Sequence, residues 1–84
     1  MTNTEVLKKQ IIYRSKHRGV KEMDLLLGNF VKKYIDKFSF DELEDLNKLL
    51  FIDDDLLYKW YFEKISNNTI PNTKVSAMLK NFKL

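Results

Sequence analysis

The chain has no cysteine, a single histidine, one proline and two glycines among its 84 residues. Without cysteine there is no disulfide framework, no thiolate zinc or iron–sulfur site and no cysteine nucleophile. A lone histidine cannot form a metal-binding pair, and the few glycines make no phosphate-binding loop. His17 also lacks a serine partner at a recognisable spacing. These absences argue against a self-sufficient enzyme.

Long apolar runs are absent as well. The longest one is only a few residues, whereas a membrane-spanning helix requires roughly 20. The polar start MTNTEVLKKQ has neither the apolar segment of a secretion signal nor the Arg- and Ser-rich character of a mitochondrial leader. We therefore expect a soluble protein of a bacterial-type cytoplasm rather than one of the mitochondrial matrix.

Charge is distributed unevenly along the chain, although the net charge is only +3. Residues 1–21 carry six Lys/Arg and one Glu, and residues 64–84 carry four Lys and no acid. Residues 36–63 between them carry nine Asp/Glu and three Lys. Nucleic-acid binding would need a basic stripe on one face, which this acidic middle would dilute.

The apolar spacing is helical nearly throughout, and no alternating strand pattern competes with it. A first helix is expected over residues 4–16, after a Thr2–Glu5 pair at capping-box spacing. Its loose apolar stripe consists of Val6, Leu7, Ile11 and Tyr13. Gly19 follows where this helix ends, as the left-handed residue that closes it.

The second helix has the clearest apolar stripe. That stripe consists of Met23, Leu26, Leu27, Phe30, Val31 and Tyr34. A third helix begins at Ser39, which can cap the free amides while Glu42 reaches back. Its apolar positions are Leu43, Leu46, Leu49 and Leu50.

Three consecutive aspartates, residues 53–55, place negative charge where the dipole of a fourth helix favours it. A calcium loop is a poorer explanation, because its spacing and its glycine are missing. The apolar positions of the fourth helix are Leu56, Leu57, Trp60, Tyr61 and Ile65. A short fifth helix opens after Pro71, with Asn72 and Thr73 as cap candidates, and runs through Val75, Met78, Leu79 and Phe82.

Five short helices with brief connections predict an all-α fold, a compact five-helix bundle in which residues 1–84 form a single domain. The chain contains no linker or repeat. The predicted core consists of Leu26, Leu27, Phe30, Leu43, Leu46, Leu50, Leu57, Trp60 and Leu79.

The stretch RSKHRGVKEMD, residues 14–24, holds the rare residue types of this chain. Both arginines, the only histidine and one of the two glycines fall within six positions: Arg14, His17, Arg18 and Gly19. A guanidinium offers a planar fork that lysine cannot replace, so the arginines are candidates to recognise a carboxylate, a phosphate or backbone carbonyls. Local structure offers a competing explanation, because Glu22 and Asp24 suit the first turn of any helix. The residues alone leave both explanations open.

The longer segment RSKHRGVKEMDLLLGNF resembles the signature of the succinate dehydrogenase assembly factor 2 family, which promotes covalent flavinylation. The family hallmark is Arg-Gly-x-x-Glu, commonly extended to Arg-Gly-x-x-Glu-x-Asp, and its positions are filled by Arg18, Gly19, Glu22 and Asp24. The segment FSFDELEDLNKLLFIDDDLLYKWYF is similar to the family's second block, with Asp54, Asp55, Leu56 and Trp60 in its Asp-Asp-Leu and tryptophan pattern. Val20 departs from the methionine or threonine that is frequent in the family.

This resemblance implies a chaperone and not an enzyme. Such a chaperone binds the flavoprotein subunit of succinate dehydrogenase and promotes covalent attachment of FAD to a histidine of that client. The resemblance also leaves fumarate reductase open as a second client, and it implies that this chain binds no cofactor stably.

The implied partner-binding residues are Arg14, His17, Arg18, Gly19, Glu22 and Asp24. Gly19 is assigned to close approach of the client, and Arg18 to a charge-assisted hydrogen bond with it. Glu22 is assigned to a polar contact near the flavin, whereas Asp24 would orient Arg18 or the second helix. Arg14 and His17 would form a supporting rim.

Two alternatives remain beside this interpretation. One is a small basic helical domain that binds nucleic acid through its first helix. The other is a generic protein-interaction module whose exposed aromatic residues, with Phe38, Tyr58 and Phe62 as candidates, mark the interface. Under the family interpretation we expect a monomer, no nucleic-acid partner and no membrane insertion.

Overall fold

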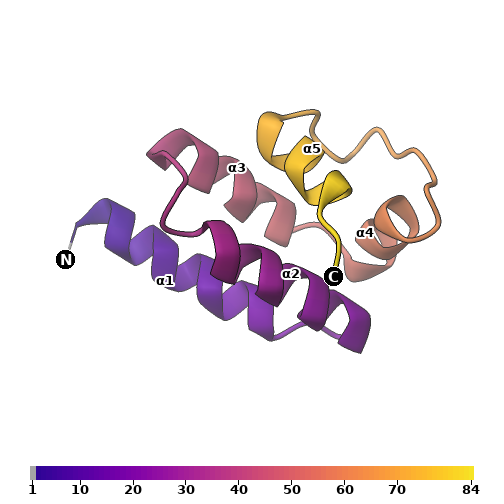
Figure 1. The fold of residues 1–84 in the computed structure, drawn as a ribbon, viewed down its shortest axis with the longest axis horizontal. Helices are drawn as coiled ribbons and strands as arrows, with labels where there is room; N and C mark the ends of the chain where they lie inside the picture. Colours follow the sequence, from indigo (N-terminus) through magenta and orange to yellow (C-terminus); the bar gives the residue numbers. More distant parts are fainter. Residues whose placement is uncertain (1) are drawn as a thin grey trace.

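The computed structural model describes residues 2–84, and this part of the chain contains five helices and no strand. The helices are α1 (Asn3–Lys16), α2 (Lys21–Tyr34), α3 (Phe40–Leu50), α4 (Asp54–Tyr61) and α5 (Lys74–Asn81). Helices α1 and α2 run in opposite directions beside each other; α3 packs on α1, and α5 packs on α3 (Figure 1). The predicted all-α bundle is confirmed. No helix within residues 2–84 is both long and apolar enough to cross a lipid bilayer.

Side-chain caps define where the helices begin. The Thr2 hydroxyl accepts a hydrogen bond from the Glu5 backbone nitrogen at the start of α1. Ser39 and Glu42 form the predicted reciprocal capping box at the start of α3, with bonds of 3.2 and 2.9 Å. Thr73 rather than Asn72 caps α5. Each cap satisfies amide groups that the first turn of a helix leaves unpaired.

Helix α4 begins as predicted but ends earlier than its apolar pattern suggested. The Asp53 carboxylate accepts a hydrogen bond from the Asp55 backbone nitrogen at 3.1 Å and so caps the helix. After Tyr61 the chain turns away, and Lys64 has a φ angle of 59°. Ile65, which we had assigned to the buried stripe of α4, therefore lies outside the helix with 49% of its surface exposed.

All nine residues of the predicted core are buried. The stripe predicted for α1 is partly wrong, because Val6 and Tyr13 are exposed. Ile11 is buried as predicted, and so is Ser15, whose hydroxyl donates a hydrogen bond to the Ile12 carbonyl at 2.8 Å. A serine can lie in this interface because its only polar side-chain atom is satisfied within the helix.

The C-terminal segment closes the core from the side of α2. Phe82 packs edge-on against Phe30 with 5.3 Å between ring centroids, and the Tyr61 hydroxyl donates a hydrogen bond to the Phe82 carbonyl. Phe38 stacks on Tyr34 and is half-buried, so this aromatic candidate for an exposed interface belongs largely to the core. Tyr58 is half-buried in the same way, whereas Phe62 is 37% exposed.

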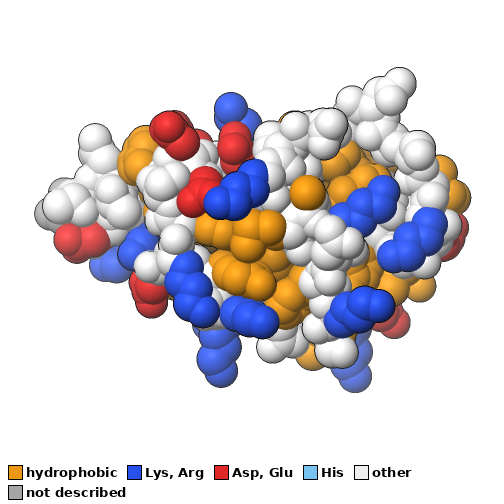
Figure 2. Space-filling view, turned by 45° about the horizontal axis from the view of Figure 1, so that its top comes forward, with side chains coloured by type: hydrophobic (Ala, Val, Ile, Leu, Met, Phe, Trp, Pro, Cys, Tyr) orange, Lys and Arg blue, Asp and Glu red, His pale blue; other side chains and the backbone are white. Residues whose placement is uncertain are grey.

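A shallow hollow of about 600 Å³ lies between α2 and α5 on this side of the molecule. Its lining combines aromatic side chains with lysines: Lys33, Tyr34, Lys74, Ala77, Met78, Asn81, Phe82 and Lys83. Figure 2 shows basic side chains, Lys or Arg, around apolar surface. Lys33 lies over the rings of Tyr34 and Phe82, so part of the apolar surface is covered by lysine stems.

Candidate functional site

The four residues between α1 and α2 form a tight junction, to which the candidate motif contributes Arg18 and Gly19. His17 ends α1, and Val20 precedes α2 without a side-chain cap. No glycine of the chain has a positive φ angle. The prediction that Gly19 closes α1 in the left-handed conformation is therefore wrong, and the need for glycine at this position is not conformational.

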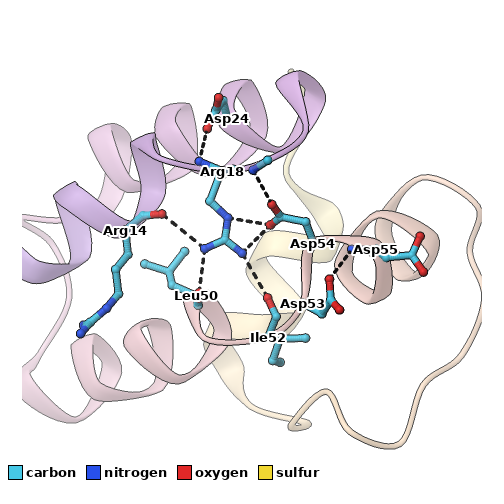
Figure 3. A network of polar contacts seen from close by, with 9 residues as sticks. Arg14, Arg18, Asp24, Leu50, Ile52, Asp53, Asp54 and Asp55 are labelled. Atoms are coloured by element: carbon cyan, nitrogen blue, oxygen red, sulfur yellow. Dashed lines mark hydrogen bonds and ion pairs between the residues drawn. The ribbon is translucent and has the colours of Figure 1, made fainter.

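The Arg18 side chain points into the protein, and only 8% of its surface is exposed (Figure 3). Its Nε donates to Asp54 Oδ1 at 2.7 Å, and its Nη2 donates to the Ile52 carbonyl at 3.1 Å. Nη1 donates to the carbonyls of Leu50 at 2.7 Å and Arg14 at 3.3 Å. All three guanidinium nitrogens are thus engaged within the chain.

This geometry changes the role that we assigned to Arg18. A charge-assisted hydrogen bond to a client needs a donor that reaches the surface, and each nitrogen of this guanidinium already has an internal acceptor. The planar fork instead joins the end of α1 to the segment between α3 and α4. Arg18 is therefore a positioning residue for the junction.

Two carboxylates hold the backbone of the motif. Asp54 Oδ2 accepts a hydrogen bond from the Gly19 nitrogen at 2.8 Å, while its other oxygen binds Arg18. Asp24 Oδ1 accepts from the Arg18 backbone nitrogen at 2.7 Å. Asp24 thus orients Arg18 as predicted, through the main chain rather than the guanidinium. Consecutive amide groups are fixed by side chains of α4 and α2.

Gly19 presents an open backbone face to solvent. A Cβ atom added there would meet only Asp54 Oδ2, at an ordinary contact distance of 3.7 Å. Beside it lies an open hollow of about 550 Å³, which we call the acidic hollow; its lining consists of Gly19, Val20, Glu22, Asp53, Asp54, Asp55 and Tyr58. The protein itself leaves space at Gly19, so another molecule can approach the main chain closely.

The Glu22 carboxylate lies on the exposed first turn of α2. It forms no hydrogen bond or ion pair with any residue of the range 2–84. The neighbouring Asp55 differs, because Lys59 lies 3.2 Å from it. Glu22 is consequently the motif side chain that is available for a partner.

The two rim candidates lie at the end of α1, Arg14 in its last turn and His17 directly after it. Arg14 Nη1 donates to Asn47 Oδ1 at 2.8 Å, and the guanidinium lies 4.2 Å from the centre of the Phe51 ring. His17 is exposed, and its ring lies 4.2 Å from that of Tyr13. Sequence reasoning found Arg14 and His17 but missed Phe51, which has no motif to mark it.

Asp54 is the second residue that the sequence did not single out for this role. The aspartate triplet predicted a helix start, and nothing local distinguished its middle member as the partner of Arg18, 36 positions away. Within residues 2–84 no group of three His, Cys, Asp or Glu side chains is arranged to hold a metal ion. The carboxylates of the triplet serve instead as a cap, an internal ion pair and a surface ion pair.

Comparison with known proteins supports the family resemblance that the motif indicated. Residues 9–83 match the model of a family described as flavinator of succinate dehydrogenase. The chain is 34% identical over 80 residues to succinate dehydrogenase assembly factor 2, mitochondrial, of Debaryomyces hansenii, covering 90% of this chain and 56% of that protein. The protein of the same name from Saccharomyces cerevisiae is 36% identical over 87 residues, covering 96% and 54%. The one from Dictyostelium discoideum is 39% identical over 64 residues, covering 76% and 45%.

The chain spans about half the length of the curated relatives that it matches. No solved structure matches it. The expectation of a bacterial-type cytoplasmic protein is wrong, because relatives from yeasts and from Dictyostelium are named as mitochondrial proteins and point to mitochondria. That expectation rested on the composition of the first residues of the sequence alone.

The family match covers the motif, both sequence blocks and all but the first residues of α1. Its members are assembly factors rather than enzymes. This chain belongs to the family of succinate dehydrogenase flavinators.

Proposed function

We propose that this chain binds the flavoprotein subunit of succinate dehydrogenase and promotes covalent attachment of FAD to a histidine of that subunit. The observation that carries the proposal is the exposed Gly19 backbone, held by Asp54 and open on its outer side. The family match and the names of the relatives support the identity of the client. Fumarate reductase, as a related flavoprotein, is a second client to test.

The client and its cofactor supply the chemistry in this proposal. A small rigid body that holds reacting groups of the client in the correct geometry lowers the entropic part of a barrier without contributing a nucleophile. Rigidity at the contact point is therefore what this chain must provide. The bonds from Asp54 and Asp24 to consecutive amides supply it at the junction.

Each motif residue has a distinct part in this proposal. Gly19 allows the client backbone to come close, and the Glu22 carboxylate makes a polar contact with the client near the flavin. Arg18 and Asp24 position the junction from within the protein. Arg14 and His17 form the rim on the side of α1.

The acidic hollow does not suit FAD itself. It is lined by Glu22 and the three aspartates, whose negative charges oppose a diphosphate. This supports a mechanism in which the client holds FAD and this chain binds no cofactor stably. We propose that the chain acts as a monomer, without nucleic acid and without inserting into a membrane.

A co-expression experiment tests the function. The client is produced with the unmodified chain, with Gly19→Arg or with Gly28→Arg, and covalent flavin is measured by fluorescence in denaturing gels. Gly28→Arg is the matched control, because it adds the same side chain at the other glycine, where a Cβ would meet no atom within 4 Å. The covalent flavin content of the client should fall with Gly19→Arg but not with Gly28→Arg. Normal flavinylation with folded Gly19→Arg would remove the motif from the mechanism.

A further inference from the structure

Phe51 is the most exposed large hydrophobic side chain in residues 2–84, with 67% of its surface accessible. It lies immediately after α3 and shortly before Asp53 in the sequence, and it takes no part in the core. An aromatic ring left in water forgoes the burial that its neighbours Leu49 and Leu50 obtain. A partner surface would bury it.

The backbone that carries Phe51 is held firmly. Arg18 donates to the carbonyls of Leu50 and Ile52, the residues on either side. The Phe51 nitrogen donates to the Lys48 carbonyl at 3.2 Å. The ring is thus presented from a fixed position, which reduces the entropy lost when a partner binds.

Arg14 adds a cationic group to the ring. Its guanidinium lies over Phe51 at 4.2 Å, and the Nη1 bond to Asn47 fixes its direction. Nε and Nη2 of Arg14 make no hydrogen bond within residues 2–84 and can still donate to a carboxylate. Aromatic residues and arginine are enriched in protein–protein interfaces, and arginine is among the residue types that dominate binding energy.

The buried Arg18 side chain supports both the stack of Arg14 on Phe51 and the Arg-Gly motif. Arg18 binds Asp54, which holds the Gly19 amide, and it also binds the carbonyls that flank Phe51 (Figure 3). The exposed glycine backbone and the exposed ring therefore keep a fixed relation to each other. A rigid client surface that meets one of them can meet the other without further ordering.

We propose that the stack of Phe51 and Arg14 is a second anchor for the flavoprotein client, entering an apolar socket whose rim carries a carboxylate for Arg14. This inference rests on the proposed function and names the chemistry of the complementary surface. It assigns Phe51 to client binding, although Phe51 is not one of the pattern positions named in the second block.

Binding of the full chain to the purified flavoprotein subunit tests the inference. Phe51→Ala should raise Kd by about tenfold or more. Phe40→Ala is the matched control, because Phe40 is also exposed (42%) and lies at the other end of the same helix. It should change Kd by less than about twofold. Thermal denaturation of both variants checks that they remain folded.

A second test measures Kd for Arg14→Gln, alone and combined with Phe51→Ala. If the two side chains act as one anchor, the double variant should bind only slightly more weakly than Phe51→Ala, because the effects of coupled residues are not additive.

Wild-type affinity in folded Phe51→Ala overturns the inference. If Gly19→Arg abolishes binding in the same assay, the proposed function stands without this anchor. If the unmodified chain neither binds the subunit nor raises its flavin content, the proposed function itself is wrong.

Discussion

Asp54 Oδ2 accepts a hydrogen bond from the backbone nitrogen of Gly19 at 2.8 Å, although the two residues are 35 positions apart. The other oxygen of this carboxylate binds the Arg18 guanidinium. One side chain at the start of α4 thus fixes both residues of the Arg-Gly pair. We expect its loss to lower the stability of the fold and to weaken partner binding.

Replacing this carboxylate should destabilise the fold. Asp54→Asn leaves the nearly buried Arg18 without its counter-charge, which should lower the free energy of unfolding by about 3 kcal/mol in urea titrations. Asp55→Asn removes only an exposed ion pair with Lys59 and should change it by less than about 0.5 kcal/mol. Equal effects of the two changes would contradict the role of Asp54.

The fork of Arg18 should not be replaceable by another cation. An ammonium group has one nitrogen and cannot reach the Asp54 carboxylate and the carbonyls of Leu50 and Ile52 together. Arg18→Lys should therefore reduce the free energy of unfolding by about 2 kcal/mol, because acceptors lose their donors. Arg14→Lys, which removes one side-chain bond to Asn47 and the guanidinium stack on the exposed Phe51 ring, should cost clearly less in the same measurement.

Alanine at position 19 should be tolerated by the fold. Gly19 has no positive φ angle, and a Cβ there would be in ordinary contact at 3.7 Å. Gly19→Ala should therefore leave the free energy of unfolding unchanged or raise it by about 0.5 kcal/mol, since alanine restricts the unfolded chain. A clear loss in thermal or urea unfolding would show that glycine is required for folding rather than for the approach of a partner.

Stability should depend on pH through Glu42. The pKa of Glu42 lies below its ordinary value of 4.5, chiefly because the Ser39 backbone N–H donates to it and also because Lys74 is 3.2 Å away. A lowered folded-state pKa gives stability that is complete above the unfolded pKa and is lost as pH falls through the folded one. The free energy of unfolding should thus decrease below about pH 4.5.

Variants isolate this contribution. Urea titrations over pH should show a shallower decrease for Glu42→Gln than for the unmodified chain. Lys74→Gln should reduce the slope less, because the bond from Ser39 is the larger cause. A Glu42→Gln variant with the unmodified slope would exclude the capping carboxylate as a source of acid sensitivity.

The helices were predictable because their signals are local. Apolar stripes at helical spacing and the Ser39–Glu42 capping box act within a few residues of sequence. The errors occurred where local signals conflict with tertiary structure. Ile65 continues the stripe of α4 in sequence, but the chain has already turned at Lys64.

The inner layer of the site could not be predicted in the same way. The direction of Arg18 depends on acceptors that lie 32 to 36 positions further along the chain. A backbone carbonyl is present at every residue, so sequence does not mark the ones that an arginine will reach. The motif singled out candidate residues, and the structure places the Arg18 side chain inside the protein while Gly19 and Glu22 are exposed.

Arg18 contacts the main chain, and not the side chains, of the segment that leads from α3 to α4. The bonds that fix the backbone on either side of residue 51 therefore do not depend on which side chain this residue carries. Substitution at this one position can therefore change the exposed side chain while the bonds that hold the surrounding backbone persist.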